Sequence, residues 1–285
     1  MEQLIERIPS SEFKPKEDIH YVDVFDTFEL FEGLAFRAPT ILVGPKGIGK
    51  TLSVQAFALR KQVPIVTFDC SEDVRRAHLL GMQVLRGDST PFVLGPLTTA
   101  YEVANEVGSC ILVLEEINAL TPQMQKVLNS PLDWRNRIEV PECGRVFKLK
   151  PDCKLWICGT MNTAIYGGVY QLNEDLKSRV RLVTMDYPKL AKERALVNTV
   201  LKKQGVEADQ KLIEKVLLLA HETRQKAMDY ALSPRDVFQI IEDAAALNLE
   251  TSLRLVLGKF EDADRATVRE RITSIFGIKI ESEAA

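Results

Sequence analysis

Predominantly apolar runs of four or five residues recur at intervals through the first two thirds of the chain. Five of these runs are candidate strands: Thr40–Val43, Ile65–Phe68, Cys110–Leu114, Leu155–Cys158 and Arg181–Met185. Most of them lack the alternation of apolar and polar residues that marks a half-exposed strand, which indicates a parallel sheet covered on both faces. Helical patterns such as Thr98–Val107 and Pro122–Leu128 lie between some of the runs. The pattern therefore predicts an α/β domain.

Two stretches interrupt this alternation of strands and helices. Residues 80–97 contain three glycines and two prolines with short apolar runs between them, which predicts a hairpin or loop insertion. Residues 137–150 contain two alternating stretches around Pro-Glu-Cys-Gly, which predicts a β-hairpin.

The two ends of the chain differ from its middle. Residues 1–18 are polar, charged and proline-bearing, so we expect a surface arm, and an apolar stripe over 21–36 predicts a helix before the first strand. After Tyr187-Pro188 the strand patterns cease, and four helical patterns follow: Lys189–Gln204, Gln210–Lys226, Pro234–Leu249 and Asp262–Phe276. We therefore predict an arm over 1–18, an α/β core over 19–188 and an all-helical domain over 189–285.

The first candidate strand runs directly into a glycine-rich loop that fits G-x-x-x-x-G-K-[ST] at every fixed position. Its glycines let backbone N–H groups converge on phosphate oxygens at the start of the following helix. Lys50 supplies a positive charge to the terminal phosphates, and the Thr51 hydroxyl can ligate Mg²⁺. The sequence thus predicts a nucleotide site, and the residues expected to form it are Gly44, Pro45, Lys46, Gly47, Ile48, Gly49, Lys50, Thr51 and Leu52.

Two carboxylates, Glu115 and Glu116, follow the strand Cys110–Leu114. Open α/β sheets bind ligands at the carboxyl ends of their strands, so we expect these side chains in the site. One carboxylate would hold Mg²⁺ through water and the other would polarise the attacking water. The alternative is a pair of exposed loop glutamates.

Further polar residues follow other predicted elements. Thr160 and Asn162 end the strand Leu155–Cys158 and could fix the water near the terminal phosphate, although an Asn at a strand end is more often a turn residue. Arg179 and Arg181 stand at the last strand. Arg235 falls in the first turn of a helix that Ser233 would cap, where its charge opposes the helix dipole and suggests an anionic partner. A solvated arginine is the alternative.

Composition and charge narrow the class of protein. The 285 residues are 46% hydrophobic and 27% charged, as in ordinary soluble globular proteins, and the net charge of -3 gives no hint of a polyanionic partner. No apolar run approaches the length of a membrane span. The five cysteines are odd in number and contain no C-x-x-C, which favours buried free thiols in a reducing compartment, so we expect a cytoplasmic protein. The three histidines are scattered and suggest no metal cluster.

The order of these motifs resembles that of AAA+ ATPases, and within them the MoxR-type group, which includes the CbbQ/NorQ-like and dynein-related branch. The resemblance covers roughly residues 20–250. It implies a P-loop NTPase αβα sandwich with a five-stranded parallel sheet and a C-terminal all-helical lid. It also implies ATP and Mg²⁺ at the interface between copies of the chain, in a ring that usually has six members. Residues 80–97 and 137–150 would be the helix-two insert and the pre-sensor hairpin, which commonly face the pore or the partner.

The resemblance also implies roles for single residues. Gly44–Thr51 matches Walker A, Leu112–Glu116 matches Walker B with Glu116 as the catalytic glutamate, and Asn162 matches sensor 1. Arg179 matches the arginine finger, with Arg181 as a neighbouring candidate, and Arg235 matches sensor 2. Glu115 stands where the family has Asp, so its longer side chain could loosen the Mg²⁺ site and slow hydrolysis.

Three functions follow from this reading. The first is an oligomeric ATPase that remodels a protein client, and MoxR-type proteins often act with von Willebrand factor A-domain proteins. The second is a nucleotide-gated scaffold with weak or absent hydrolysis. The third is a nucleic-acid motor or restriction subunit, because Gly159-Thr-Met-Asn-Thr-Ala is similar to McrB-type GTPases, although the acidic net charge disfavours it. ATP is the expected nucleotide, with GTP as the alternative, and the sequence does not name the client.

Overall fold

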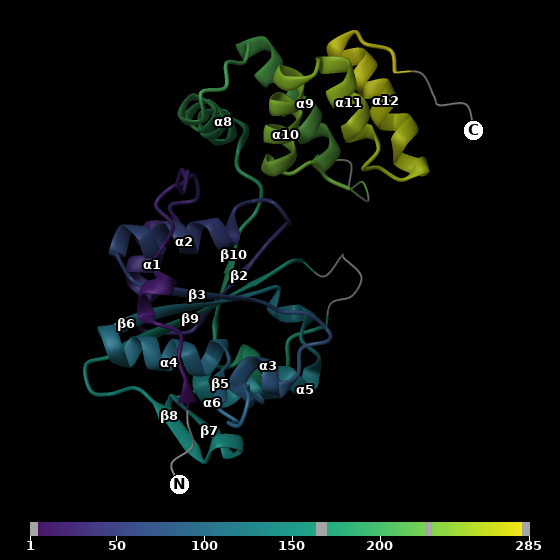
Figure 1. Cartoon of the computed structure of the whole chain (residues 1–285). Coiled ribbons are helices and arrows are strands. Elements are labelled where there is room, and N and C mark those ends of the chain that lie inside the picture. Colours follow the sequence, from purple (N-terminus) through teal and green to yellow (C-terminus); the bar gives the residue numbers. More distant parts are fainter. Residues whose placement is uncertain (1–4, 164–169, 226–227, 229, 281–285) are drawn as a thin grey trace. The chain divides into compact units, whose positions relative to one another are not determined.

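The computed structural model describes residues 5–163, 170–225, 228 and 230–280 (Figure 1). The chain divides into two compact units. The core unit comprises Met1–Ile19, Asp26–Gly44 and Gly49–Met185. The helical unit comprises His20–Phe25, Pro45–Ile48 and Asp186–Ala285. The tip of the glycine-rich loop therefore belongs to the helical unit.

A five-stranded sheet forms the centre of the core unit. Its strands are β2 (Thr40–Val43), β3 (Ile65–Asp69), β6 (Ser109–Glu115), β9 (Lys154–Met161) and β10 (Arg181–Thr184). They lie in the order β10-β2-β9-β6-β3, and every neighbouring pair is parallel. This confirms the predicted fold class. The inner strands are buried on both faces, which is why they read as continuous apolar runs.

Helices cover both faces of this sheet. Figure 1 shows α1 (Thr27–Leu34) and α2 (Lys50–Lys61) on one face and α4 (Pro96–Val107) on the other. Under α1 and α2, the rings of Phe31, Phe57 and Trp156 pack edge to face with centroids 5.3–5.8 Å apart. The predicted helix over 21–36 is shorter than expected, because Asp26 adopts a left-handed conformation with φ 57° that no helix continues through.

Short elements complete the core unit. They are η1 (Ser10–Phe13), α3 (Arg76–Leu80), η2 (Ile117–Ala119), α5 (Pro122–Gln125), η3 (Lys126–Leu128), α6 (Asn129–Leu132), η4 (Pro141–Cys143) and α7 (Glu174–Lys177). In the stretch where a hairpin is predicted, β7 (Arg137–Val140) pairs antiparallel with β8 (Arg145–Lys148).

The insertion at 80–97 forms a small sheet with the N-terminus. β4 (Gly81–Gln83) pairs antiparallel with β5 (Phe92–Leu94), and β1 (Ile5–Glu6) adds to β5 in parallel. Ion pairs at 2.9 Å join Arg7 to Glu102 and Arg86 to Glu6. The described part of the expected surface arm is thus tied to the core unit by a strand and ion pairs.

In the described part of the helical unit, five helices surround a hydrophobic core of their own. They are α8 (Leu190–Gln204), α9 (Gln210–Gln225), α10 (Pro234–Ala246), α11 (Leu249–Leu257) and α12 (Asp262–Phe276). A buried ion pair crosses this core: Arg224 donates to both carboxylate oxygens of Glu193 at 2.7 and 2.8 Å and to the Leu232 carbonyl at 2.6 Å. This pair fixes the segment that leads into α10.

Among the described residues, no helix combines the length and the apolar composition that a membrane span requires.

Candidate functional site

The glycine-rich loop connects β2 to α2, as the motif requires. The Gly44 N–H donates to the Met161 carbonyl at 3.2 Å, which ties the start of the loop to the end of β9. Gly49, with φ 91°, caps α2 without a side-chain hydrogen bond. This twelve-residue helix thus begins directly after a glycine, and its dipole and first N–H groups favour an anion there.

The Lys50 side chain is buried, with 8% of its surface exposed. Its ammonium donates to the Gly44 carbonyl at 2.9 Å and to Asn162 Oδ1 at 3.0 Å. A buried ammonium is stable only with such partners. These two bonds place a positive charge between the loop and the end of β9.

The Thr51 hydroxyl donates to Glu115 Oε2 at 2.8 Å. Thr51 is the second residue of α2 and Glu115 is the last residue of β6, so this bond links the start of the helix to the end of the strand. The longer side chain of Glu, compared with the Asp that the family has here, still reaches the hydroxyl. Hydroxyl and carboxylate oxygens are the ligands that Mg²⁺ accepts, so these two residues fit the ion.

Glu116 adopts a left-handed backbone conformation, φ 50° and ψ 45°, directly after β6. Its N–H donates to Thr160 Oγ1 at 3.3 Å, and its Oε1 accepts a bond from Asn162 Nδ2 at 3.2 Å. The backbone turn thus directs the carboxylate towards the end of β9. Asn162, which touches both Lys50 and Glu116, joins the loop to the acidic strand end.

Asn118 is a buried polar residue beside the site that the sequence did not predict as a site residue. It is 1% exposed, and its Nδ2 donates to the Asn162 carbonyl at 3.4 Å. Asn118 therefore helps to hold the backbone of Asn162 in place. The signal in the sequence is a polar residue two positions after the glutamate pair.

Negative charge gathers at the carboxyl ends of β3 and β6. Burial, and then the carboxylates of Asp69, Glu115 and Glu116, raise the pKa of the Cys70 thiol to about 12. The thiol stays protonated at neutral pH and is no nucleophile. Among the described residues, no group of three or more His, Cys, Asp or Glu side chains could hold a metal alone.

The two arginines at β10 differ in burial. Arg181 is exposed, whereas Arg179 is half-buried and donates to the Asp175 carbonyl and, at 3.4 Å, to the Ser178 hydroxyl. Its Nε is buried and has no hydrogen-bond partner in the described part of the chain. In that part, Arg179 bonds to the end of α7 and not to the residues around Lys50.

Arg235 lies in the first turn of α10 in the helical unit and is exposed. Ser233 caps this helix as predicted, because its hydroxyl accepts the Asp236 N–H at 3.4 Å while Asp236 Oδ2 accepts the Ser233 N–H at 2.8 Å. Gly47, at the loop tip in the same unit, packs closely here: a Cβ on it would lie 2.4 Å from Ser233 Oγ. The start of α10 therefore lies against the loop tip.

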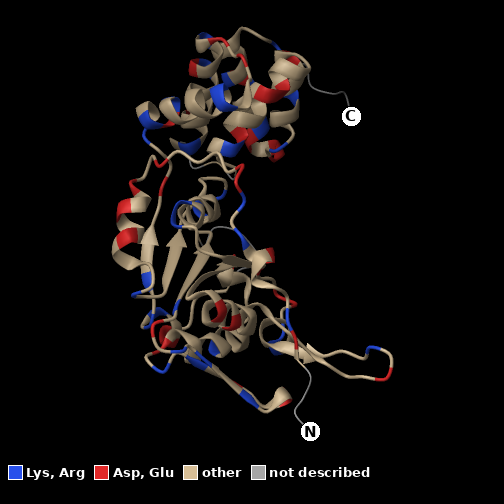
Figure 2. Ribbon diagram, turned by 60° about the vertical axis from the view of Figure 1, so that its left-hand side comes forward, with Lys and Arg blue, Asp and Glu red and all other residues tan. Residues whose placement is uncertain are grey.

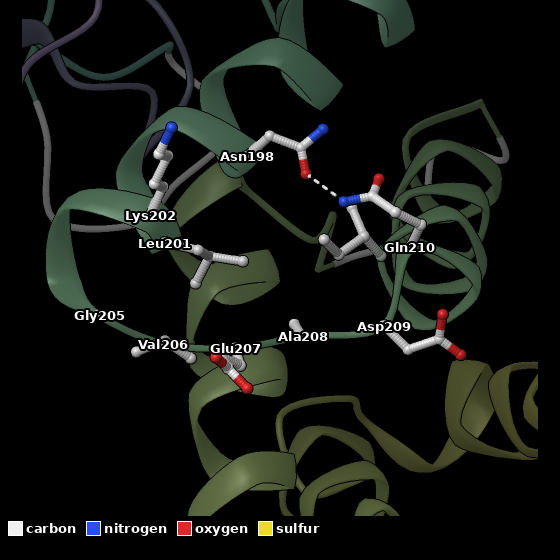
Figure 3. A pocket seen from close by; sticks show the side chains of 10 residues that line it. Asn198, Leu201, Lys202, Gly205, Val206, Glu207, Ala208, Asp209 and Gln210 are labelled. Carbon is white, nitrogen blue, oxygen red and sulfur yellow. Dashed lines mark hydrogen bonds between the residues drawn. The ribbon is translucent and has the colours of Figure 1, made fainter.

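A pocket of about 790 Å³ opens on the helical unit beside the connection from α8 to α9 (Figure 3). Asn198 accepts a bond from Gln210 at 3.0 Å, and Leu201, Val206 and Ile213 contribute apolar surface. None of the predicted site residues lines it. It is separate from the candidate site.

This chain is similar to known proteins, and the matching family model covers mainly the core unit. Residues 39–180 match the family model described as AAA domain (dynein-related subfamily). An uncharacterised protein of Staphylococcus epidermidis is 26% identical over 233 residues, which cover 78% of this chain and 84% of the relative. A Staphylococcus aureus protein is 27% identical with the same coverage.

Two solved structures share the fold. A mutant RuvB of Thermotoga maritima has a TM-score of 0.53 at 15% identity, and the match covers 89% of this chain and 77% of the RuvB chain. NtrX of Brucella abortus in complex with ADP has a TM-score of 0.51 at 16% identity, over 80% of this chain and 51% of its own.

Proposed function

Because residues 39–180 match the model of the AAA domain (dynein-related subfamily), we propose that this protein binds Mg·ATP at the glycine-rich loop and hydrolyses it to remodel a protein partner. One observation carries the proposal. Asn162 bonds to Lys50 and to Glu116, while Thr51 bonds to Glu115, so the phosphate-binding residues and both carboxylates form one connected group. A glycine-rich turn without a ligand has no need of this group.

The loop binds the triphosphate by charge and by its N–H groups. The first N–H groups of α2 and the Lys50 ammonium would bind the phosphate oxygens, and Lys50 would exchange its bond to the Gly44 carbonyl for bonds to these oxygens. Mg²⁺, held by the Thr51 hydroxyl and through water by Glu115, would supply charge that offsets that of the phosphates. ATP is the proposed nucleotide. A protein of this fold was solved with ADP, which agrees with that choice.

The hydrolytic residues are Glu116 and Asn162. Glu116 would accept a proton from the attacking water. Asn162, which already bonds to the Glu116 carboxylate, would orient that carboxylate and the water. The pair lies at the ends of β6 and β9, two neighbouring strands of a rigid sheet. Rigid support of this kind holds the base in place without a cost at the moment of reaction.

Two arginines would complete the site. Arg235, which matches sensor 2, would act on the phosphates, and Arg179 would act as a finger on the nucleotide of an adjacent copy. This requires a homo-oligomer, and a MoxR-like ring of six is the form we propose. The client would be a protein, for which a von Willebrand factor A-domain protein is one candidate.

Charge and cysteines support two further parts of the proposal. Basic and acidic residues are interspersed along the ribbon of both units (Figure 2), which disfavours a nucleic-acid motor or a McrB-like role. All five cysteines are free, and four of them are buried. Free buried thiols are usual in a reducing compartment, so we propose the cytoplasm.

Nucleotide binding and phosphate release, measured on three variants, test this function. Lys50→Ala should lose ATP binding. Glu116→Gln should bind ATP within a few-fold of wild type but hydrolyse it at least about 100-fold more slowly, since it removes the general base. Glu250→Gln, the same change at an exposed side chain, should match wild type.

Near-normal turnover of Glu116→Gln would remove the assigned base. A wild-type protein that binds ATP and assembles, yet releases no phosphate, would favour the nucleotide-gated scaffold.

A further inference from the structure

The two tryptophans of the chain lie in opposite environments. Trp156 is 1% exposed in the aromatic cluster under α2, whereas Trp134 is 90% exposed in the turn between α6 and β7. A tryptophan offers about 150–250 Å² of largely apolar surface, and leaving it in water forgoes the gain of burial. A fully exposed tryptophan is therefore a candidate contact residue.

The turn that carries Trp134 is held rigidly. The Asn136 N–H donates to the Asp133 carbonyl at 3.1 Å, and the Arg135 N–H donates to Asp133 Oδ1 at 2.8 Å. The buried Tyr101 donates its hydroxyl to Asn136 Oδ1 at 2.6 Å. The side chain is thus presented by a pre-organised backbone, which reduces the entropy lost when a partner covers it.

This turn lies beside the proposed finger. The short helices α6 and α7 pack against each other. Trp134 lies two residues after the end of α6, and Arg179 lies two residues after the end of α7. Hydrogen bonding by Arg135, with a smaller attraction from Arg179, lowers the pKa of Asp133, so the Arg179 charge lies near the turn. Leu182, three residues after Arg179, is a further exposed apolar side chain.

We propose that Trp134 is an anchor of the contact between two copies of this chain, on the same face as Arg179. The inference rests on the proposed function, in which Arg179 must come within a few ångströms of a neighbour's nucleotide. A second copy is the occupant because the turn adjoins Arg179, which in the proposed function faces the neighbouring copy. The buried Arg179 Nε, which has no partner in the described chain, agrees with a site completed from outside.

Intrinsic fluorescence tests this contact in the full-length protein, because Trp156 is buried and Trp134 is not. In dilute protein without nucleotide, acrylamide should quench the Trp134 emission. When Mg·ATP analogue drives assembly, confirmed by light scattering, quenching should fall to the level of the Trp134→Phe variant, which reports Trp156 alone.

A second variant adds an energetic readout. Trp134→Ala should raise the protein concentration for half-assembly about tenfold or more, as expected for an interface anchor. Nucleotide affinity of the dilute chain should stay unchanged. Leu85→Ala, an equally simple truncation at a side chain that is 76% exposed on the β4–β5 hairpin, should assemble as wild type does.

Assembly with Trp134 still open to acrylamide would overturn this inference and leave the proposed function intact. If Trp134 became protected from acrylamide only when another protein was added, that protein, and not a second copy of this chain, would be the partner that covers Trp134. A chain that binds Mg·ATP but stays single would overturn both the contact and the shared site, while the loop would keep its role in binding.

Discussion

Glu116 shows at the scale of one residue what the sequence could predict and what it could not. Two glutamates after an apolar run identify an acidic strand end. The left-handed backbone at Glu116, which costs a non-glycine residue about 1–3 kcal/mol, has no sequence signal. The bonds from Asn162 and to Thr160 hold this conformation, and they depend on tertiary neighbours. The residue types were therefore predictable, but not the orientation of the carboxylate.

Asp236 is a second residue whose setting emerges only from the fold. Its carboxylate is 3% exposed and accepts bonds from the Lys259 ammonium, Ser233 and the Tyr230 hydroxyl. Burial alone would raise its pKa, but these hydrogen bonds prevail and lower it. The ionised form is thus favoured in the folded helical unit.

This lowered pKa predicts a pH dependence of stability. The unfolded group titrates near about 3.9, so its contribution is present above that pH and is lost as the pH falls through the lower, folded pKa. Asp236→Asn should therefore lower the free energy of unfolding by about 2 kcal/mol at pH 7 and by progressively less below pH 4. Urea unfolding followed by circular dichroism, from pH 7 to pH 3, measures the difference.

Asp262→Asn is the matched control, because that carboxylate is 94% exposed and should show little effect at any pH. A difference between wild type and Asp236→Asn that is constant with pH, or grows in acid, would contradict the assignment.

At the scale of elements, buried parallel strands were the most predictable. The apolar runs of β2, β3, β6, β9 and β10 were recognised within a few residues of their ends. The sequence-based prediction did not include α11. The apolar pattern predicts one helix over 234–249, whereas in the structure α10 ends at Ala246 and α11 begins at Leu249. In the structure Leu247 leaves helical geometry, and the Asn248 side chain accepts the Thr251 N–H at 2.8 Å to start a new helix. Local capping here overrides the apolar stripe.

The sequence Gly95-Pro96-Leu97, where the insertion at 80–97 ends and α4 begins, is explained by close packing. A Cβ on Gly95 would lie 2.5 Å from the Leu79 carbonyl oxygen and 2.7 Å from the Gly81 nitrogen. Pro96 then occupies the first position of α4, and Leu97 is fully buried. The close approach of two backbones positions the root of the β4–β5 hairpin against α4.

Gly95→Ala should therefore destabilise the core unit by about 1–3 kcal/mol, because backbone atoms cannot give way as a flexible side chain can. Denaturant unfolding of the whole chain measures the loss. Gly33→Ala is the control: no atom lies within 4 Å of the added Cβ in α1, and this change should be neutral or stabilising by up to about 1 kcal/mol. Equal stability of the two variants would refute the close-approach argument.

At the scale of the whole molecule, sheet order brings the site together. β2, β9 and β6 are neighbours, and Val43 pairs with Met161 as Leu114 pairs with Gly159. The carboxyl ends of three strands distant in sequence therefore align, which places Lys50, Asn162 and Glu116 within bonding distance. Apolar runs do not reveal strand order; the resemblance to a known family implied the sheet.

The division into two units was less predictable. The sequence suggests one boundary near residue 188, and the helical unit does take up the chain from Asp186. It also contains His20–Phe25 and Pro45–Ile48, two short segments from the first part of the chain. Contacts of this kind come from tertiary packing, as between Lys192 Nζ and the Val24 carbonyl at 2.8 Å, and composition carries no sign of them.

The central claim is that an ATP site on one copy is completed by Arg179 of another. The variant Arg179→Ala keeps an intact glycine-rich loop but lacks the finger arginine. The variant Lys50→Ala keeps the finger arginine but lacks the lysine that the loop needs to bind ATP. Arg181→Ala, at the exposed neighbour of Arg179, is the control and should retain its activity if Arg179 is the finger.

The most direct measurement is phosphate release by an equimolar mixture of Arg179→Ala and Lys50→Ala, with assembly confirmed by light scattering. Each variant alone should be inactive, and the mixture should recover up to about a quarter of wild-type turnover, since about a quarter of random contacts pair an intact loop with an intact arginine. Full activity of Arg179→Ala alone, or an assembled mixture that recovers none, would contradict a site shared between copies.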